Sequence, residues 1–309
     1  MTRLVLKALL VVALLVLPLL PAHANEPVPG PPLPPEPTPA PIDGTGTPFQ
    51  FKAHCDVHSS APDDSVVKPG QTGAAHMHTF FGGTPINAFS TSESLRAGHT
   101  TCHMPQIESA TATNGADRAG YWIAALYDQH GRQRVPSHVV AYYQRGAHDG
   151  TVEPFPAGLK IVTSNYAWRC VRPDNSKTAA QSTIPACASD QHLMLRLQFP
   201  QCWDGINLDT ADHRSHMAFL SQGACPPSHP HKVVDLRISA RWAGDIAHGI
   251  SRYRGDLGAY LSSDAEAGTS RGRSAHGDFL EGWLREHLEF QVYHCVNRNA
   301  GCNASDSNV

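Results

Sequence analysis

Charged side chains are scarce in this sequence, and no long run of one sign occurs. Lysine, arginine, aspartate and glutamate make up 17% of the 309 residues, and the formal net charge is −3. Binding to nucleic acid or to an anionic membrane usually requires clustered basic residues. We therefore expect neither of them among the partners of this protein.

Several cofactor and catalytic motifs are also missing. The sequence has no H-E-x-x-H zinc-protease pattern, no phosphate-binding P-loop and no dinucleotide-binding fingerprint. None of its eight cysteines forms a C-x-x-C pair, which argues against a zinc site built from thiolates. Beyond the N-terminal segment, no apolar run is long enough to cross a bilayer.

The N-terminal segment resembles an export signal. Arg3 and Lys7 precede an apolar run over residues 8–20, and Ala22-His23-Ala24 follows as a cleavage site. We predict a signal peptide over 1–24, a proline-rich linker over 25–48, a single globular domain over 49–302 and a disordered tail over 303–309. The expected location is therefore secreted, periplasmic or in the cell envelope, with no membrane span after signal cleavage.

An even number of cysteines in an exported protein predicts disulfides. Pairing of neighbours in the sequence is our hypothesis for their connectivity. It joins Cys55 to Cys102, Cys170 to Cys187, Cys202 to Cys225 and Cys295 to Cys302.

Strand-like patterns dominate the predicted domain. Residues 121–127 are apolar on both faces, and residues 193–199 and 234–239 alternate between apolar and polar side chains. Residues 138–144 and 288–294 are also predicted as strands. Turns rich in proline and glycine separate these runs. The pattern predicts a mainly β, antiparallel sandwich or jelly-roll-like domain with long loops and disulfide staples.

Few short helices are expected. Ser90 and Glu93 form a capping-box pattern, and Gly98 is suited to end a two-turn helix. Asp278 and Glu281 form a similar pattern, so Asp278 is interpreted first as a helix N-cap.

The most informative segment for function is residues 75–83, AHMHTFFGG. In an extended backbone His76 and His78 point to the same side, because side chains alternate across a strand. Two imidazoles on one wall can bind a metal ion or transfer protons. The competing interpretation is that His76 only holds the turn before Phe80.

Further groups must complete such a site. We predict catalytic roles for His76, His78, Asp204, His216 and His276, and a divalent metal ion held by His76, His78 and His216. His213 and His229 are further histidines in the same region of the sequence. A metal cofactor is a possibility that the spacing leaves open.

Two other arrangements remain open. One is an acid/base pair of carboxylates for glycoside hydrolysis, drawn from Asp204, Asp209, Asp212, Asp278 and Glu281. The other combines His76 or His216 as base with Tyr121, Tyr142 or Tyr143 as acid, while Arg96, Arg145 or Arg196 neutralises a uronate carboxylate. Trp203 and Trp283 are expected in the core.

Five blocks of the sequence resemble a known family. They are His76–Gly82 (HMHTFFG), Gln201–Gly205 (QCWDG), His213–Met217 (HRSHM), Cys225–Pro230 (CPPSHP) and His276–Trp283 (HGDFLEGW). In this order they resemble a secreted bacterial and fungal domain-of-unknown-function family, number nineteen ninety-six in that series. No catalytic residues are assigned in that family.

Fungal members of that family sometimes carry sugar-binding modules. The resemblance therefore implies a cell-wall or polysaccharide context. From the histidine and polar blocks spread along the chain we predict a hydrolase or lyase that acts on extracellular or cell-wall polysaccharide through a histidine-rich pocket. The alternative is a non-catalytic module of the cell envelope that binds glycan or metal. An extracellular glycan is the expected partner, and the sequence does not define the oligomeric state.

Overall fold

The computed structural model describes residues 49–104, 115–147, 150–244 and 251–298. The predicted signal peptide, proline-rich linker and C-terminal tail lie outside these ranges. So does Cys302, and with it the predicted Cys295–Cys302 disulfide.

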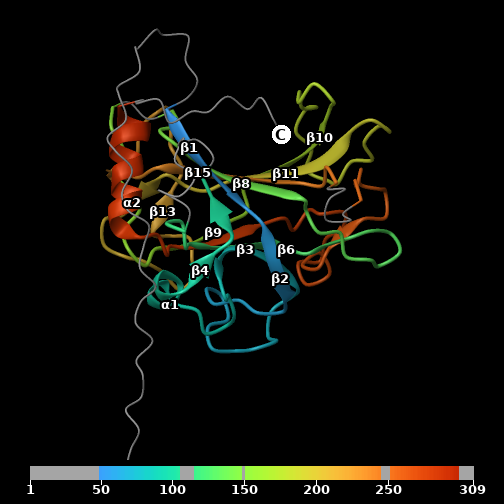
Figure 1. Ribbon diagram of the computed structural model, residues 1–309, viewed down its shortest axis with the longest axis horizontal. Helices are drawn as coiled ribbons and strands as arrows, with labels where there is room; N and C mark the ends of the chain where they lie inside the picture. Colours follow the sequence, from blue (N-terminus) through green and yellow to red (C-terminus); the bar gives the residue numbers. More distant parts are fainter. Residues whose placement is uncertain (1–48, 105–114, 148–149, 245–250, 299–309) are drawn as a thin grey trace, which may run out of the picture.

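Two antiparallel sheets form the body of the described chain (Figure 1). The first sheet has the order β10 (Tyr166–Val171), β11 (His192–Gln198), β15 (Asp235–Arg241), β8 (His138–Gln144), β1 (Gln50–Cys55) and β5 (Cys102–His103). The second has the order β2 (Val57–Ala61), β3 (His78–Thr84), β6 (Gly120–Ala124), β17 (Gly277–Leu280) and β9 (Lys160–Thr163), with β4 (His99–Thr100) paired to β3. The fold is therefore the predicted mainly β, antiparallel sandwich.

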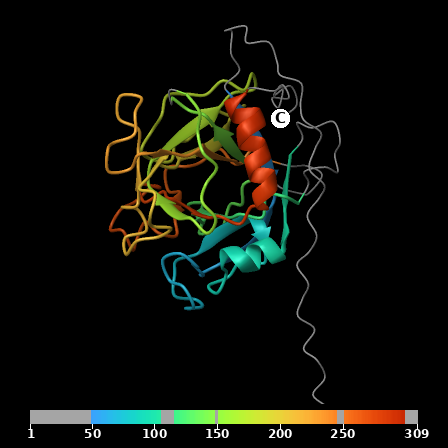
Figure 2. The same ribbon diagram turned by 90° about the vertical axis from the view of Figure 1, so that its left-hand side faces the viewer.

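Smaller elements surround the two sheets. They are the triplet β13 (Met217–Ala218), β12 (Cys202–Trp203) and β14 (His231–Lys232), the pair β7 (Leu126–Tyr127) and β16 (Tyr260–Leu261), and the helix α1 (Ser92–Ala97). Near the C-terminal end, α2 (Arg285–Phe290) continues into a π-helix, η1 (Gln291–Asn297). This helical segment runs along one side of the sandwich (Figure 2).

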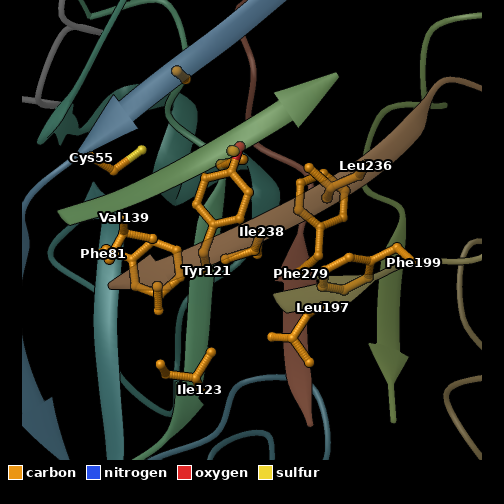
Figure 3. Close-up of a cluster of buried hydrophobic side chains, with 14 of the residues drawn as sticks. Cys55, Phe81, Tyr121, Ile123, Val139, Leu197, Phe199, Leu236, Ile238 and Phe279 are labelled. Carbon is orange, nitrogen blue, oxygen red and sulfur yellow. The ribbon is translucent and has the colours of Figure 1, made fainter. Parts of the chain in front are cut away.

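Side-chain alternation builds the core between the sheets. Phe81, Tyr121 and Phe279 of the second sheet face inward, toward Leu197 and Ile238 of the first sheet (Figure 3). Burial of apolar surface on this scale is the main force that holds two sheets together.

The outward-facing positions of the second sheet are also buried. They form a separate apolar cluster of Phe80, Trp122, Val162 and Leu280, which packs against Val66, Ile86 and Leu95. Val66 belongs to the connection between β2 and β3, and Leu95 belongs to α1. This outer face is therefore covered by loop and helix rather than exposed to water.

Within the described residues three disulfides staple the domain, and each joins a pair predicted from the sequence. They are Cys55–Cys102, Cys170–Cys187 and Cys202–Cys225. The first links β1 to β5 at the edge of the first sheet.

The strand predictions over 121–127, 138–144, 193–199 and 234–239 correspond to β6 with β7, β8, β11 and β15. The helix after Ser90 is present as α1, with Thr91 as the N-cap in a capping box with Ser94. Two predictions were wrong. Residues 278–281 do not start a helix, because Asp278 lies within β17. Residues 288–294 are helical, because Leu288, Val292, Cys295 and Val296 all face the core at helical spacing.

Asp117 gives the core a pH-dependent component. Its carboxylate accepts hydrogen bonds from the Tyr121 hydroxyl and the Ala119 amide, and Tyr121 in turn contacts Tyr143. Burial, helped by the charge of Glu281, raises the pKa of Asp117 from 3.8 to about 7. In the folded protein this carboxyl therefore holds its proton at pH values where the unfolded chain has lost it.

Because the folded pKa is the higher one, this contribution to stability is complete below pH 3.8 and is lost as the pH rises toward about 7. As the pH rises from about 5 to about 8, the free energy of unfolding should fall less for Asp117→Asn than for wild type, because the amide cannot ionise. Urea unfolding midpoints at the two pH values measure this difference. The exposed substitution Asp56→Asn is the control, and parallel curves for wild type and Asp117→Asn would contradict the prediction.

Candidate metal centre

Two neighbouring elements of the second sheet position the candidate site. His78 is the first residue of β3 and Asp278 the second residue of β17, and both strands pair with the central strand β6. His78 lies opposite Ala124 and Asp278 opposite Trp122, so the two side chains share the outer face of the sheet. His76 and His276 each lie two residues earlier in the chain and bring their rings to the same place.

The three imidazoles are in mutual contact. Ring centroids are 4.3 Å apart for His76 and His78, 5.0 Å for His76 and His276, and 5.7 Å for His78 and His276. The Nε2 atoms of His76 and His276 are 3.2 Å apart. One potential ligand atom from each of the three rings lies within 4.8 Å of the others.

The hydrogen bonds at the outer edge of the cluster fix the tautomer of each ring. Nδ1 of His78 donates to the Asp63 carbonyl oxygen at 2.9 Å, and Nδ1 of His276 donates to the Ser274 carbonyl oxygen at 2.9 Å. Nδ1 of His76 lies 3.0 Å from the Glu266 carboxylate. Since carbonyl and carboxylate oxygens only accept, all three Nδ1 atoms carry the proton. In a neutral ring the Nε2 atom then keeps a lone pair, and the Nε2 atoms of His76 and His276 lie 3.2 Å apart.

Two polar groups in the cluster have no partner among the described residues. His78 is fully buried, and its Nε2 atom makes no hydrogen bond. Asp278 is fully buried as well, and neither of its carboxylate oxygens has a hydrogen-bond donor. The nearer contact is from Asp278 Oδ2 to His276 Nε2, at 3.7 Å. Unpartnered buried groups of this kind cost folding free energy.

Burial also sets the protonation states. It lowers the pKa of His78 well below 6.5, and the neighbouring His76 and His276 add to this effect. It also lowers the pKa of His276 to about 4, with a smaller contribution from His76. Burial raises the pKa of Asp278 well above 3.8, and the nearby charge of Asp64 adds to this rise. Around neutral pH the imidazoles of His78 and His276 are therefore neutral, as metal ligation requires.

The donor set fits a divalent metal ion. Zinc–nitrogen bonds of about 2.0–2.1 Å in tetrahedral geometry place two ligand nitrogens about 3.3 Å apart. The 3.2 Å between the two Nε2 atoms matches that edge. Asp278 supplies a carboxylate whose Oδ2 atom lies 3.7 Å from His276 Nε2, and the ligand atoms of Asp64, His78 and Asp278 lie within 4.8 Å of one another.

A small pocket gives access to the cluster. Its volume is about 170 Å³, and its lining includes His76, His276, Asp278, Glu266 and Arg214. The side chains of His76 and His276 are 18% and 15% exposed, whereas Glu266 at the rim is 69% exposed. Solvent therefore reaches two of the three imidazoles.

Two predicted site residues lie outside this cluster. His216 is buried with both ring nitrogens engaged, Nδ1 with the Thr210 hydroxyl and Nε2 with the Lys160 carbonyl oxygen at 2.7 Å. Asp204 accepts hydrogen bonds from the backbone amides of Ile206 and Asn207, and these bonds lower its pKa against the effect of burial. The structure brings together His76, His78 and His276, and it gives His216 and Asp204 contacts that hold a neighbouring loop.

Structural contacts also engage most of the groups in the two other arrangements. Tyr121 and Tyr143 are fully buried in the core, and Glu281 forms a buried ion pair with Arg96. Asp209 pairs with His213, and Asp212 caps a turn through the amides of Arg214 and Ser215.

Asp64, Glu266 and Arg214 were not predicted from the sequence as neighbours of the site. No local signal marks them, because each comes from a loop that only the fold brings near the histidines. For Asp278 a signal existed: the spacing from His276 to Asp278 repeats that from His76 to His78. His78 lies in β3 and Asp278 lies in β17, and their side chains share the outer face of the second sheet.

Residues 268–272 have the form G-x-S-x-G, which in α/β-hydrolases marks a nucleophilic serine between a strand and a helix. Here Ser270 is exposed between two turns, 262–268 and 271–274, and the next described helix, α2, begins only at Arg285. Asp264 organises this loop, because its carboxylate accepts hydrogen bonds from the backbone amides of Gly272 and Ser274. The segment therefore lacks the setting of a nucleophile elbow.

The family model described as "Domain of unknown function (DUF1996)" matches residues 64–283, and the chain belongs to this family. The match includes all three histidines of the cluster, Asp64 and Asp278. No curated protein and no solved structure matches the chain. Within the described residues, no helix is both long and apolar enough to span a bilayer.

Proposed function

We propose that His76, His78, His276 and Asp278 bind a divalent transition-metal ion, and that the centre serves a secreted hydrolase or lyase acting on extracellular polysaccharide. The observation that supports the metal site is the group of three imidazoles whose ligand atoms lie within 4.8 Å of one another, next to a buried Asp278 carboxylate with no hydrogen-bond donor. A bound cation would accept the imidazole lone pairs and would compensate the charge of the carboxylate.

An imidazole-rich donor set suits zinc and its neighbours among the transition metals rather than calcium or magnesium. The backbone carbonyls of Asp63 and Ser274 orient two of the rings, an arrangement typical of metal-binding histidines. A bound ion of this kind activates water or polarises an oxygen of the substrate. Arg214 at the pocket is placed to attract an anionic sugar group, and Glu266 orients His76.

One feature favours the alternative, a non-catalytic metal-binding module. Three imidazoles and one carboxylate already make four protein ligands, and a tetrahedral ion with four protein ligands has no position left for substrate. The two functions differ in turnover and not in metal content, so activity distinguishes them. We also propose that the protein is exported, that its globular domain spans residues 49–302, and that its partner is an extracellular glycan.

Two measurements test the proposed function. Elemental analysis and titration of metal-free protein with zinc should show one ion per chain for wild type. A screen of acidic and neutral polysaccharides should show new reducing ends with wild type and none with His76→Ala. Ultraviolet-absorbing unsaturated ends among the products would mark a lyase, and their absence would mark a hydrolase.

His130→Ala is the matched control, because His130 is an exposed histidine of a distant turn. It should keep both metal and activity. Metal binding without product from any polysaccharide would favour the binding module, and wild-type protein that takes up no metal would contradict both functions.

A further inference from the structure

The face of the first sheet that points away from the core carries a second, larger concavity. Its volume is about 440 Å³, within the range of roughly 300–1,000 Å³ usual for ligand sites. It is lined by residues of β10, β11 and β15 and of the adjoining loops, namely Asn165, Tyr166, Ala167, Arg169, Lys177, Met194, Arg196, Gln198 and Arg237. We call it the basic groove.

Strand register explains how the groove arises. Gln198 on β11 lies opposite Arg237 on β15, and Met194 on β11 lies opposite Arg169 on β10. Arg196 lies between Met194 and Gln198 and shares their face, because alternate residues of a strand face the same way. The intervening residues Leu195 and Leu197 point into the core. The groove is therefore a built feature of the sheet.

The charge of the groove is opposite to that of the whole chain. Four cationic side chains line it and no carboxylate does, whereas the formal net charge of the chain is −3. Arg237 is neutralised by an adjacent carboxylate, since its Nη2 atom lies 2.6 Å from Asp235. Arg169 uses Nη1 to donate to the Thr178 carbonyl oxygen.

Arg196 is the central cation. Its guanidinium lies 5.3 Å from the centre of the Tyr142 ring, which holds it in place as a cation–π contact. It has no carboxylate partner among the described residues. Burial lowers its pKa, as do the charges of Arg237 and Arg169, whereas Tyr142 and the Asp235 carboxylate act in the opposite direction. Because Asp235 already pairs with Arg237, an anion that enters the groove would still stabilise the half-buried Arg196 guanidinium.

We infer that the basic groove binds an anionic polysaccharide through the carboxylates of its uronate residues. Arginine forks match the two oxygens of a carboxylate, and Arg196, Arg169 and Lys177 offer successive cationic positions for a repeating charge. Asn165 and Gln198 add amides suited to sugar hydroxyl groups. The half-buried ring of Tyr166 supplies an amphipathic surface.

This inference extends the glycan partner of the proposed function but uses none of the metal ligands. Its test is therefore made without metal: calorimetric titration of oligogalacturonate into the full chain in the presence of EDTA. Wild type should bind, and its affinity should fall as salt rises from about 50 to 200 mM, as expected when charges are neutralised. A neutral cello-oligosaccharide should not bind.

Arg196→Gln should weaken oligogalacturonate binding by about tenfold or more, because a charge-assisted contact is lost. Lys177→Glu, at an exposed position that folding tolerates, should weaken it as well. Arg172→Gln is the matched control, because Arg172 is exposed in the turn that follows β10 and does not line the groove. Equal affinity of wild type and both groove variants would overturn the inference, as would equal binding of the neutral sugar or tighter binding of duplex DNA.

Discussion

Zinc is expected to raise the melting temperature of metal-free wild-type protein by about 5–10 °C, and His78→Ala is expected to abolish this rise. At a zinc concentration of about one hundred times Kd, binding to the native state contributes about 2.7 kcal/mol, and each kcal/mol shifts the melting temperature of a domain this size by about 2–4 °C. His78 is the fully buried one of the three imidazoles, and its removal would take away one of the four proposed ligands of the ion. Thermal unfolding with and without zinc measures the difference.

Asp278→Asn separates loss of a ligand from loss of structure. An unpaired carboxylate in this fully buried position costs stability once it ionises, so the amide should leave metal-free protein as stable as wild type or more stable at alkaline pH. The same variant should bind zinc more weakly, because it lacks the negative charge. The exposed control His130→Ala should respond to zinc as wild type does. A zinc-induced rise that persists in His78→Ala would contradict the metal centre.

Glu281→Ala is expected to lower the free energy of unfolding by about 3–5 kcal/mol, the usual cost of breaking a buried ion pair. Its fully buried carboxylate accepts hydrogen bonds from the amides of Gly158 and Trp283 and from Arg96 at 3.1 Å. Truncation leaves the amides of Gly158 and Trp283 without this acceptor, removes the buried partner of Arg96 and disconnects α1 from the end of β17. Urea unfolding at neutral pH measures the loss.

Glu93→Ala is the control for this prediction. Glu93 contacts the same arginine at 3.3 Å, but its side chain is 79% exposed. Exposed ion pairs are screened by water and contribute little, so this variant should stay within about 0.5 kcal/mol of wild type. Similar losses in the two variants would mean that Glu281 is not a structural centre of this region.

The sequence predicted the sandwich well because alternation is a local signal. Strands such as β11 and β15 carry apolar side chains at every second position, and burial of that face fixes the register of strand pairing. The same alternation predicted that His76 and His78 share a face. Asp278 was misread because a D-x-x-E pattern looks the same in a helix cap and in a strand, and only the pairing of β17 with β6 and β9 decides between them.

Contacts between distant segments were beyond sequence reasoning. Nothing near Asp64, Arg214 or Glu266 in the chain marks them as neighbours of the histidines. His216 resembled a ligand by its residue type, but its two ring nitrogens are used by Thr210 and Lys160. The basic residues of the groove are scattered through the sequence, so composition predicted no basic surface, and hydrogen bonding between strands gathers them.

The histidine cluster and the basic groove lie on opposite outward faces of the sandwich, since one belongs to the second sheet and the other to the first. A polymer segment seated in the groove cannot also occupy the pocket without turning around an edge of the domain. One protein molecule would thus grip one stretch of glycan while a different stretch, or a different strand of the wall, meets the metal. Such two-sided engagement would keep the protein anchored between successive encounters and would let it bridge neighbouring strands of a network.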